Sequence, residues 1–177
     1  MINIILASKS KIRKEILDKN SIPHQVVFSN VDEDEIKNNL LNDIEKSDII
    51  LVGVSRTSKT PTSIYLANKG FKTSNIPLVN ENSLPKKLRE NPQVTCVVGL
   101  NTEPERLVDL RKNRMNSLKE TENTKYTSIE NIKKEIMDAK KTFQKYRWPS
   151  IDVTRKSVEE TAASIIKIHE IYLNNVK

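Results

Sequence analysis

Residues 48–60 read DIILVGVSRTSKT, and this stretch decides the fold. Its first part, DIILVG (48–53), is a continuous apolar run that ends in a glycine, the pattern of a strand buried on both faces of a parallel sheet. A polar segment rich in hydroxyl groups follows, and a helical pattern then covers residues 60–68 and ends before Gly70. The stretch therefore predicts a buried strand, a loop and a helix, in that order.

Strand and helix patterns alternate on both sides of this stretch. Strands are predicted at 2–7, 24–28, 71–79, 93–99 and 150–153, and helices at 8–20, 31–46, 84–89, 103–118, 128–147 and 156–173. The alternation predicts an α/β fold: a mostly parallel sheet with helices on both faces and a P-loop-like nucleotide-binding core. The apolar strand 2–7 is expected to join that sheet, because an exposed edge of this kind promotes aggregation.

Composition and charge narrow the class of protein. The chain carries 30 basic and 23 acidic side chains, and no apolar run is long enough to cross a bilayer. Residues 1–46 have a net charge of 7 − 8 = −1, which leaves 23 − 15 = +8 for residues 47–177. Basic and acidic residues alternate instead of forming a basic block, so neither nucleic acid nor a membrane is expected as a partner. A single cysteine and the lack of a secretory signal favour the cytoplasm.

The loop from Gly53 to Thr60 has the form of a phosphate-binding loop. Its letters follow GxxxxGK[ST] between a strand and a helix, except that Ser58 stands at the second glycine. Backbone N–H groups at a helix start favour an anion, and Lys59 and Arg56 add full positive charges. Thr60 is placed to bind a magnesium ion. The alternative is a polar turn in which Ser58 caps the helix.

Two segments resemble one family. GVSRTSKTPTSIYLA (53–67) and RWPSIDVTRKSVEETA (147–162) are similar to the hallmark segments of the pyruvate, phosphate dikinase regulatory proteins, also called phosphoenolpyruvate synthase regulators. NIPLV (75–79) and VVGLNTEPERLVDLRKNRM (97–115) extend the resemblance over residues 47–175. In that family a serine is usual at the place of Ser58.

The resemblance implies a bifunctional activity. Such proteins use ADP to phosphorylate, and so inactivate, a threonine of pyruvate, phosphate dikinase or phosphoenolpyruvate synthase, and use phosphate to remove the group with release of pyrophosphate. Carried over, the residues Gly53, Val54, Ser55, Arg56, Thr57, Ser58, Lys59 and Thr60 hold the ADP phosphates. Lys59, Arg56 and Asp152 are the predicted catalytic residues, with Asp152 as a metal ligand, a proton acceptor or a plain cap. The target enzyme and any homo-oligomer are left open.

The first part of the chain resembles another family. ILASKSKIRKEIL (5–17) and IPHQVVFSNVDEDE (22–35) look like the beginning of Maf proteins, which hydrolyse nucleoside triphosphates, with Ser8, Ser10, Arg13 and Glu33 as the matching positions. The rest of the Maf site is not found. We therefore expect a partial Maf-like segment at 1–46 and a nucleotide-binding kinase/phosphorylase domain at 47–177.

Three functions remain to be compared. The first is the regulatory kinase and phosphorylase, the second is a Maf-like pyrophosphatase, and the third is an inactive nucleotide-binding remnant or interaction module. The other chemistry-bearing residues favour structural roles. Cys96 and Trp148 are expected in the core, His24 and His169 outside any metal site, and Ser157 and Glu160 at a helix start.

Overall fold

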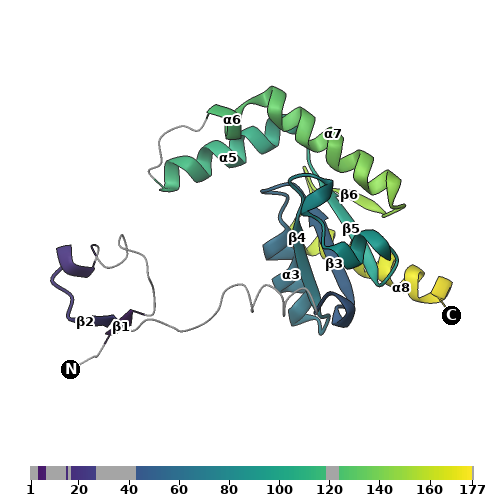
Figure 1. Ribbon diagram of the computed structural model, residues 1–177, viewed down its shortest axis with the longest axis horizontal. Helices are drawn as coiled ribbons and strands as arrows, with labels where there is room; N and C mark the ends of the chain where they lie inside the picture. Colours follow the sequence, from purple (N-terminus) through teal and green to yellow (C-terminus); the bar gives the residue numbers. More distant parts are fainter. Residues whose placement is uncertain (1–3, 7–14, 16, 27–42, 119–123, 177) are drawn as a thin grey trace. The chain divides into compact units, whose positions relative to one another are not determined.

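The computed structural model describes residues 4–6, 15, 17–26, 43–118 and 124–176. The chain divides into two compact units, Met1–Leu40 and Leu41–Lys177, shown in Figure 1. The predicted Maf-like positions Ser8, Ser10, Arg13 and Glu33 lie outside the described residues. The assignment of the first segment to a Maf-like origin therefore stays a prediction.

The first unit contains a small sheet of its own. Strand β1 (Ile4–Leu6) pairs in parallel with β2 (His24–Val26), and Ile5 lies opposite Gln25. The expectation that the strand at 2–7 joins the main sheet is wrong. About 17 residues separate the two strands, which is enough chain for a parallel crossover, so β1 finds its backbone partner locally.

The main sheet belongs to the second unit and has four parallel strands in the order β4-β3-β5-β6. Their bounds are β3 (Ile49–Gly53), β4 (Thr73–Pro77), β5 (Cys96–Asn101) and β6 (Ser150–Asp152). The two central strands are buried along their whole length. This confirms the predicted α/β fold, because a strand covered on both faces needs the continuous apolar run seen at 48–53.

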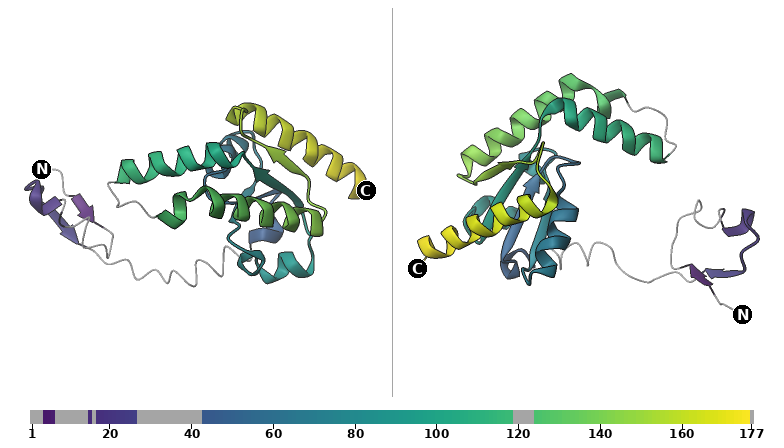
Figure 2. Two further views of the ribbon diagram at one scale, coloured as in Figure 1. Left: turned by 90° about the horizontal axis from the view of Figure 1, so that it is seen from above. Right: turned by 180° about the vertical axis from the view of Figure 1, so that it is seen from behind.

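Helices cover both faces of this sheet, as Figures 1 and 2 show. One face packs against α3 (Lys59–Asn68) and α8 (Val158–Val176), and the other against α4 (Lys86–Glu90), α5 (Pro104–Leu118) and α7 (Ile129–Lys145). Neighbouring residues of β3 supply both cores: Ile49 and Leu51 face α3 and α8, and Ile50 and Val52 face the other helices. The expected core positions of α7, Ile132, Ile136 and Phe143, are buried.

Some local features were not predicted. The short α6 (Thr124–Thr127) and the 3-10 turn η2 (Glu81–Ser83) are too short for a periodic pattern. The end of the helix predicted at 31–46 is a 3-10 turn, η1 (Asp43–Lys46), and the rest of that prediction lies outside the described residues. In α3 the residues Ile64 and Ala67 are exposed, and the helix buries Thr62, Ser63 and Leu66 instead. Gly70, with φ 93°, has the expected left-handed conformation just beyond the helix. No helix in the described ranges is long and apolar enough to span a membrane.

Gly99 has a packing role. It lies inside β5, and not at the end of the strand as the sequence suggested. A Cβ atom at this position would lie 2.7 Å from the ring of Phe143, so the glycine makes room for the aromatic side chain that α7 places on the sheet. Of the two strand glycines, only Gly53 belongs to the candidate site.

Candidate phosphate-binding site

The loop between β3 and α3 begins at a glycine that no larger residue can replace without movement. A Cβ atom on Gly53 would lie 2.4 Å from the carbonyl oxygen of Leu100 and 2.9 Å from Thr57 Oγ1. The chain then turns away from the sheet at its carboxyl edge, where open α/β sheets bind their ligands. Thr57 is fully buried, and its hydroxyl donates to the Val54 carbonyl at 3.0 Å, which closes the turn.

The backbone of the loop adopts an unusual conformation before the helix. Arg56 and Ser58 have positive φ angles of 73° and 55°. The left-handed Ser58 occupies the N-cap position, yet its side chain makes no capping hydrogen bond. The alternative of a turn capped by Ser58 is therefore wrong, because an N-cap side chain reaches back to the helix only from extended backbone. The positive φ also explains why glycine suits this position in the general motif.

The loop amides are available to an anion. Within the described ranges, the backbone N–H groups of residues 55, 56 and 58–60 have no hydrogen-bond acceptor, whereas residues 55–56 form a turn in which the Thr57 N–H faces the Val54 carbonyl. Left-handed residues within a turn, such as Arg56 and Ser58, are typical of the backbone that forms anion-binding nests. The positive end of the ten-residue helix α3 acts in the same direction.

Lys59 is turned toward the loop itself. Its ammonium donates to the carbonyl oxygens of Gly53 at 2.7 Å and Val54 at 2.8 Å, and more weakly to Thr57 Oγ1 at 3.4 Å. The side chain is only 9% exposed, and this burial lowers the pKa of the ammonium to about 8. Two of its three N–H groups are thus firmly held, and the third has only the long contact to Thr57. That third donor is the one available to a phosphate oxygen.

A cleft of about 660 Å³ opens beside the loop. Its lining combines the loop with β4 and with one face of α5: Ser55, Arg56, Ser58, Lys59, Thr60, Pro61, Asn75, Pro77, Leu110, Asn113, Arg114 and Ser117. Three of these side chains are cationic and none is acidic. The volume is in the range of small-molecule sites, and the charge favours an anionic ligand.

The predicted loop residues divide between this cleft and the interior. Ser55, Arg56, Ser58, Lys59 and Thr60 line the cleft, whereas Gly53, Val54 and Thr57 are buried and shape the turn from within. Sequence reasoning missed the wall that α5 supplies. A signal was available in LRKNRMNS (110–117), whose leucine, asparagine, arginine and serine recur at helical spacing, but the pattern alone does not say what they face.

A buried arginine connects α5 and α7 to the loop. Arg111 is 1% exposed and forms two hydrogen bonds with the carboxylate of Glu135. It also donates to the backbone oxygen of Tyr126 at 3.0 Å and lies 4.5 Å from the centre of that ring. The hydroxyl of Tyr126 in turn lies 3.2 Å from Ser55 Oγ. This connection fixes the helices beside the cleft.

Asp152 lies at the carboxyl edge of the sheet but outside the cleft lining. Its carboxylate accepts from the backbone N–H of Thr154 at 2.8 Å and from the Thr154 hydroxyl. Thr154 Oγ1 also accepts from the Glu103 N–H at 2.8 Å, so Asp152 orders the turn beside α5. Two strand spacings, roughly 10 Å, separate β6 from β3. Its role as metal ligand or proton acceptor stays a prediction.

The start of α8 has the structure expected from sequence. The Ser157 N–H donates to Glu160 Oε2 at 2.8 Å, and the Glu160 N–H donates to Ser157 Oγ at 3.1 Å. This reciprocal pair is a capping box. Ser157 and Glu160 therefore stabilise the helix start, as the sequence favoured.

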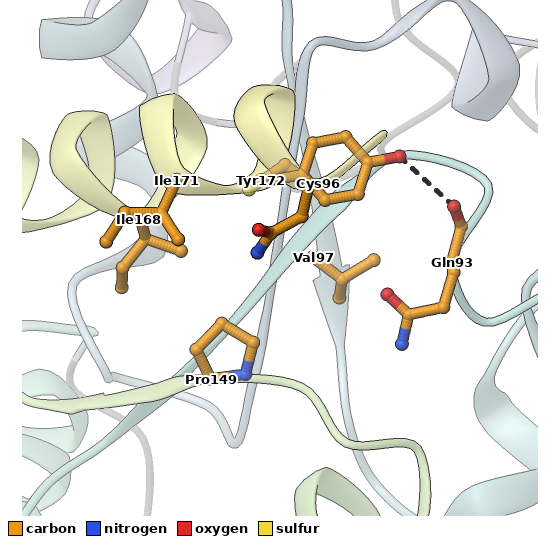
Figure 3. Close-up of a pocket in the computed structure, with 8 residues that line it drawn as sticks. Gln93, Cys96, Val97, Pro149, Ile168, Ile171 and Tyr172 are labelled. Carbon is orange, nitrogen blue, oxygen red and sulfur yellow. Dashed lines mark hydrogen bonds between the residues drawn. The ribbon is translucent and has the colours of Figure 1, made fainter. Parts of the chain in front are cut away.

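A second pocket, of about 250 Å³, is apolar and lies between α8 and the strands β5 and β6. Figure 3 shows Ile168, Ile171 and Tyr172 of α8 along one side and Pro149 across from them. Cys96 also lines it, and burial raises the pKa of this thiol to about 11, so the thiol stays protonated, as expected for an inert core cysteine. The pocket has no cationic side chain and does not fit a phosphate.

The remaining chemistry-bearing side chains are structural. Trp148 is buried, and its indole N–H donates to the Pro92 carbonyl at 2.8 Å. His169 lies edge-on to the ring of Phe71, with 5.4 Å between ring centres. The described residues hold no group of three or more His, Cys, Asp or Glu side chains arranged for a metal ion.

Comparison with known proteins now identifies the family. The model of the kinase/pyrophosphorylase family matches residues 24–166. The chain belongs to this family. A relative from Pelagibacter ubique is 73% identical over 137 residues, which cover 77% of this chain and 50% of the relative. Relatives from Erythrobacter litoralis and Streptococcus sanguinis are both 53% identical, over 71% and 66% of this chain and 45% and 42% of their own lengths.

All three relatives are named pyruvate, phosphate dikinase regulatory protein. This kinase/pyrophosphorylase chain spans about half the length of the curated relatives that it matches. The match from residue 24 includes the phosphate loop, the α5 wall and the capped start of α8. The predicted family resemblance is confirmed.

Proposed function

We propose that this protein transfers a phosphoryl group from ADP to a threonine of a pyruvate, phosphate dikinase or phosphoenolpyruvate synthase, and removes that group with inorganic phosphate. The observation that carries the proposal is the cleft itself. In a member of the kinase/pyrophosphorylase family, a loop with free backbone amides faces a cleft whose described lining has three cations and no carboxylate. The names of the relatives support the choice of protein substrate.

The proposed reactions move one phosphoryl group. In the kinase direction, the bond between the β-phosphorus of ADP and the bridging oxygen breaks, AMP leaves, and a bond forms from the threonine Oγ to that phosphorus. The threonine proton passes to Asp152 or to solvent. In the phosphorylase direction, an oxygen of inorganic phosphate attacks the phosphothreonine phosphorus, the threonine oxygen leaves and takes up a proton, and pyrophosphate forms. Both directions handle a diphosphate, ADP or pyrophosphate, which suits one cationic cleft.

The loop residues have distinct proposed roles in this scheme. The amides of residues 55, 56 and 58–60 bind the phosphate oxygens, and Lys59 contributes its third donor. Arg56 is exposed at the cleft and lies over the charge that develops during transfer. The proposal includes a cytoplasmic location, which the single cysteine of the sequence favours.

Magnesium fits the cleft only as a partner of the nucleotide. Thr60 lines the cleft, but no carboxylate does among the residues that the structure describes. Magnesium in proteins is usually held by one or two carboxylates together with phosphate oxygens and water. Here Thr60 would hold an ion that the diphosphate brings with it, and the ion would neutralise part of the phosphate charge.

A second candidate is nucleotide binding without transfer. It is favoured by one observation: Asp152, the carboxylate predicted to be catalytic, is engaged with Thr154 and lies outside the described lining of the cleft. Under this alternative, the protein binds ADP through the same loop and acts by interaction.

The experiment is a transfer assay with purified dikinase and ADP labelled at the β-phosphate. The proposal expects label on a dikinase threonine, formation of AMP in equal amount, and release of labelled pyrophosphate when phosphate is then added. ADP binding without label transfer would select the binding module. No ADP binding at all would refute both readings, and pyrophosphate release from a nucleoside triphosphate without dikinase would instead support the Maf-like activity.

A further inference from the structure

We propose that Arg114 on α5 binds the terminal phosphoryl group, the one that is transferred, across the cleft from the phosphate loop. This inference rests on the proposed function and adds a residue and a wall to its site. It separates the cleft into two parts. The loop amides and Lys59 hold the phosphate that remains with the nucleotide, and Arg114 joins the exposed Arg56 in holding the phosphate that moves.

The wall that carries Arg114 is one continuous face of α5. Leu110, Asn113, Arg114 and Ser117 all line the cleft, and their spacing of three and four residues places them in one stripe along the helix. Leu110 is the apolar member of this stripe. Asn113 and Arg114 offer hydrogen-bond donors, whereas the Ser117 hydroxyl donates to the Asn113 backbone carbonyl at 2.8 Å. The α5 wall thus has the composition of an oxyanion-binding surface.

The charge of Arg114 is uncompensated. Within the described ranges, Arg114 forms no ion pair and no hydrogen bond, and the cleft has no acidic side chain in its lining. By contrast, the two terminal nitrogens of Arg111, three residues earlier on α5, donate to Glu135 and to the Tyr126 carbonyl, and only its buried Nε lacks a partner among the described residues. A guanidinium without a carboxylate partner is free to form two parallel hydrogen bonds with one phosphate.

The α5 wall is held in place before any ligand binds. The bonds of Arg111 to Glu135 join α5 to α7, and its contact with Tyr126 continues through the tyrosine hydroxyl to Ser55 of the loop. The two sides of the cleft are therefore linked through side chains. A fixed distance between them lets one diphosphate contact both sides at once.

The burial of Lys59 and the exposure of Arg114 indicate which phosphate each of the two cations binds. Lys59 is 9% exposed at the base of the loop, whereas Arg114 is an exposed side chain. The threonine belongs to another protein and approaches from solvent, so the phosphoryl group that it attacks lies toward the exposed side. Arg114 therefore contacts the terminal phosphate.

The test compares ligands with and without that phosphate. Binding of ADP, AMP, pyrophosphate and phosphate is measured by calorimetry, or by displacement of a fluorescent ADP analogue, for the full chain and for Arg114→Gln. We expect Arg114→Gln to weaken ADP and pyrophosphate at least fivefold and to change AMP and phosphate less than twofold. The control is Lys112→Gln, which removes the same charge from the opposite side of α5 and should change none of the four.

Each other outcome overturns the inference in a distinguishable way. An equal loss for AMP and ADP would place Arg114 on the retained phosphate, and unchanged ADP affinity would remove it from the site. If Lys112→Gln weakens ADP and pyrophosphate as much as Arg114→Gln does, the effect of Arg114 comes from the net charge of α5 and not from contact with the phosphate. If the unaltered chain binds no ADP, the proposed function itself fails, whereas ADP binding that does not respond to Arg114 leaves the proposed function standing.

Discussion

Replacing Lys59 with methionine tests whether this side chain binds the ligand or only stabilises the loop. Methionine keeps the length of the side chain and its apolar stem but removes the ammonium. The structure gives the ammonium two strong acceptors, the carbonyl oxygens of Gly53 and Val54. Both keep a partner after the substitution: Gly53 O still accepts from the Leu78 N–H at 3.0 Å, and Val54 O from the Thr57 hydroxyl at 3.0 Å.

Two different magnitudes follow from these contacts. Because no buried carbonyl is left without a donor, and the cost of burying a charge disappears, Lys59→Met should lower the free energy of unfolding by only about 1–2 kcal/mol. ADP loses one charge-assisted hydrogen bond, about 1.5–3 kcal/mol, which corresponds to a roughly 10- to 150-fold rise in Kd. Binding is therefore predicted to suffer more than folding.

The assay is ADP titration by calorimetry, paired with chemical denaturation of the same sample. The matched control is Lys69→Met, at the other end of α3, where the exposed ammonium lies 5.6 Å from the ring of Tyr65. The control should bind ADP like the unaltered protein. A Lys59→Met protein that is folded and binds ADP within threefold of the unaltered protein would show that the lysine is a structural part of the loop and that the amides alone hold the ligand.

Four further predictions concern the same unit. Gly53→Ala should lower the free energy of unfolding by about 3 kcal/mol in denaturant titration, because its Cβ would lie 2.4 Å from a backbone oxygen, and a loss under about 1 kcal/mol would contradict the close approach. Ser58→Ala should cost less than about 0.5 kcal/mol in the same assay, since no capping bond is lost, whereas a capping serine would cost about 1 kcal/mol. Burial lowers the pKa of Lys59 to about 8, so ADP affinity measured by calorimetry should change little up to about pH 8 and fall above it by up to tenfold per pH unit. Over the range from pH 8 to 10.5, the unfolded lysine binds more protons than the folded one, so the contribution of this group to folding stability should rise. An ADP affinity with no change of slope near pH 8 would contradict the buried ammonium. Cys96, 2% exposed with a pKa raised to about 11, should react with iodoacetamide at pH 8 far more slowly in the native protein than in denaturant, and equal rates would contradict its burial.

The elements of the main sheet were predictable because their signals are local. The apolar runs at 48–53 and 93–99 specify strands covered on both faces, and the observed β3 and β5 are those strands. The amphipathic stripe of Ile132, Ile136 and Phe143 likewise specified the buried face of α7. The strand at 2–7 was a different case. Its composition predicted a strand but contained nothing that selects a pairing partner.

Only the local part of the candidate site was predictable, because a sequence pattern does not show which distant residues a loop meets. The loop motif is contiguous, so its position after β3 follows from the sequence. Arg114 is more than fifty residues away from the loop in sequence, and it lines the cleft only because α5, which begins after the carboxyl end of β5, lies beside the loop. The inward direction of Lys59 was also hidden, because it depends on where the Gly53 and Val54 carbonyls point after the chain turns.

The inward direction of Lys59 explains how serine stands where the general motif has glycine. A left-handed residue with a Cβ atom costs about 1–2 kcal/mol, and Ser58 gains no capping bond to offset this. The conformation persists because the next residue, Lys59, bonds back to Gly53 and Val54, and Thr57 closes the turn between them. The loop is thus held in its anion-binding shape by its own side chains, and the ligand does not have to create that shape. A preorganised loop of this kind stabilises developing phosphate charge most effectively when the opposite wall is equally fixed, which is what Arg111 provides for α5.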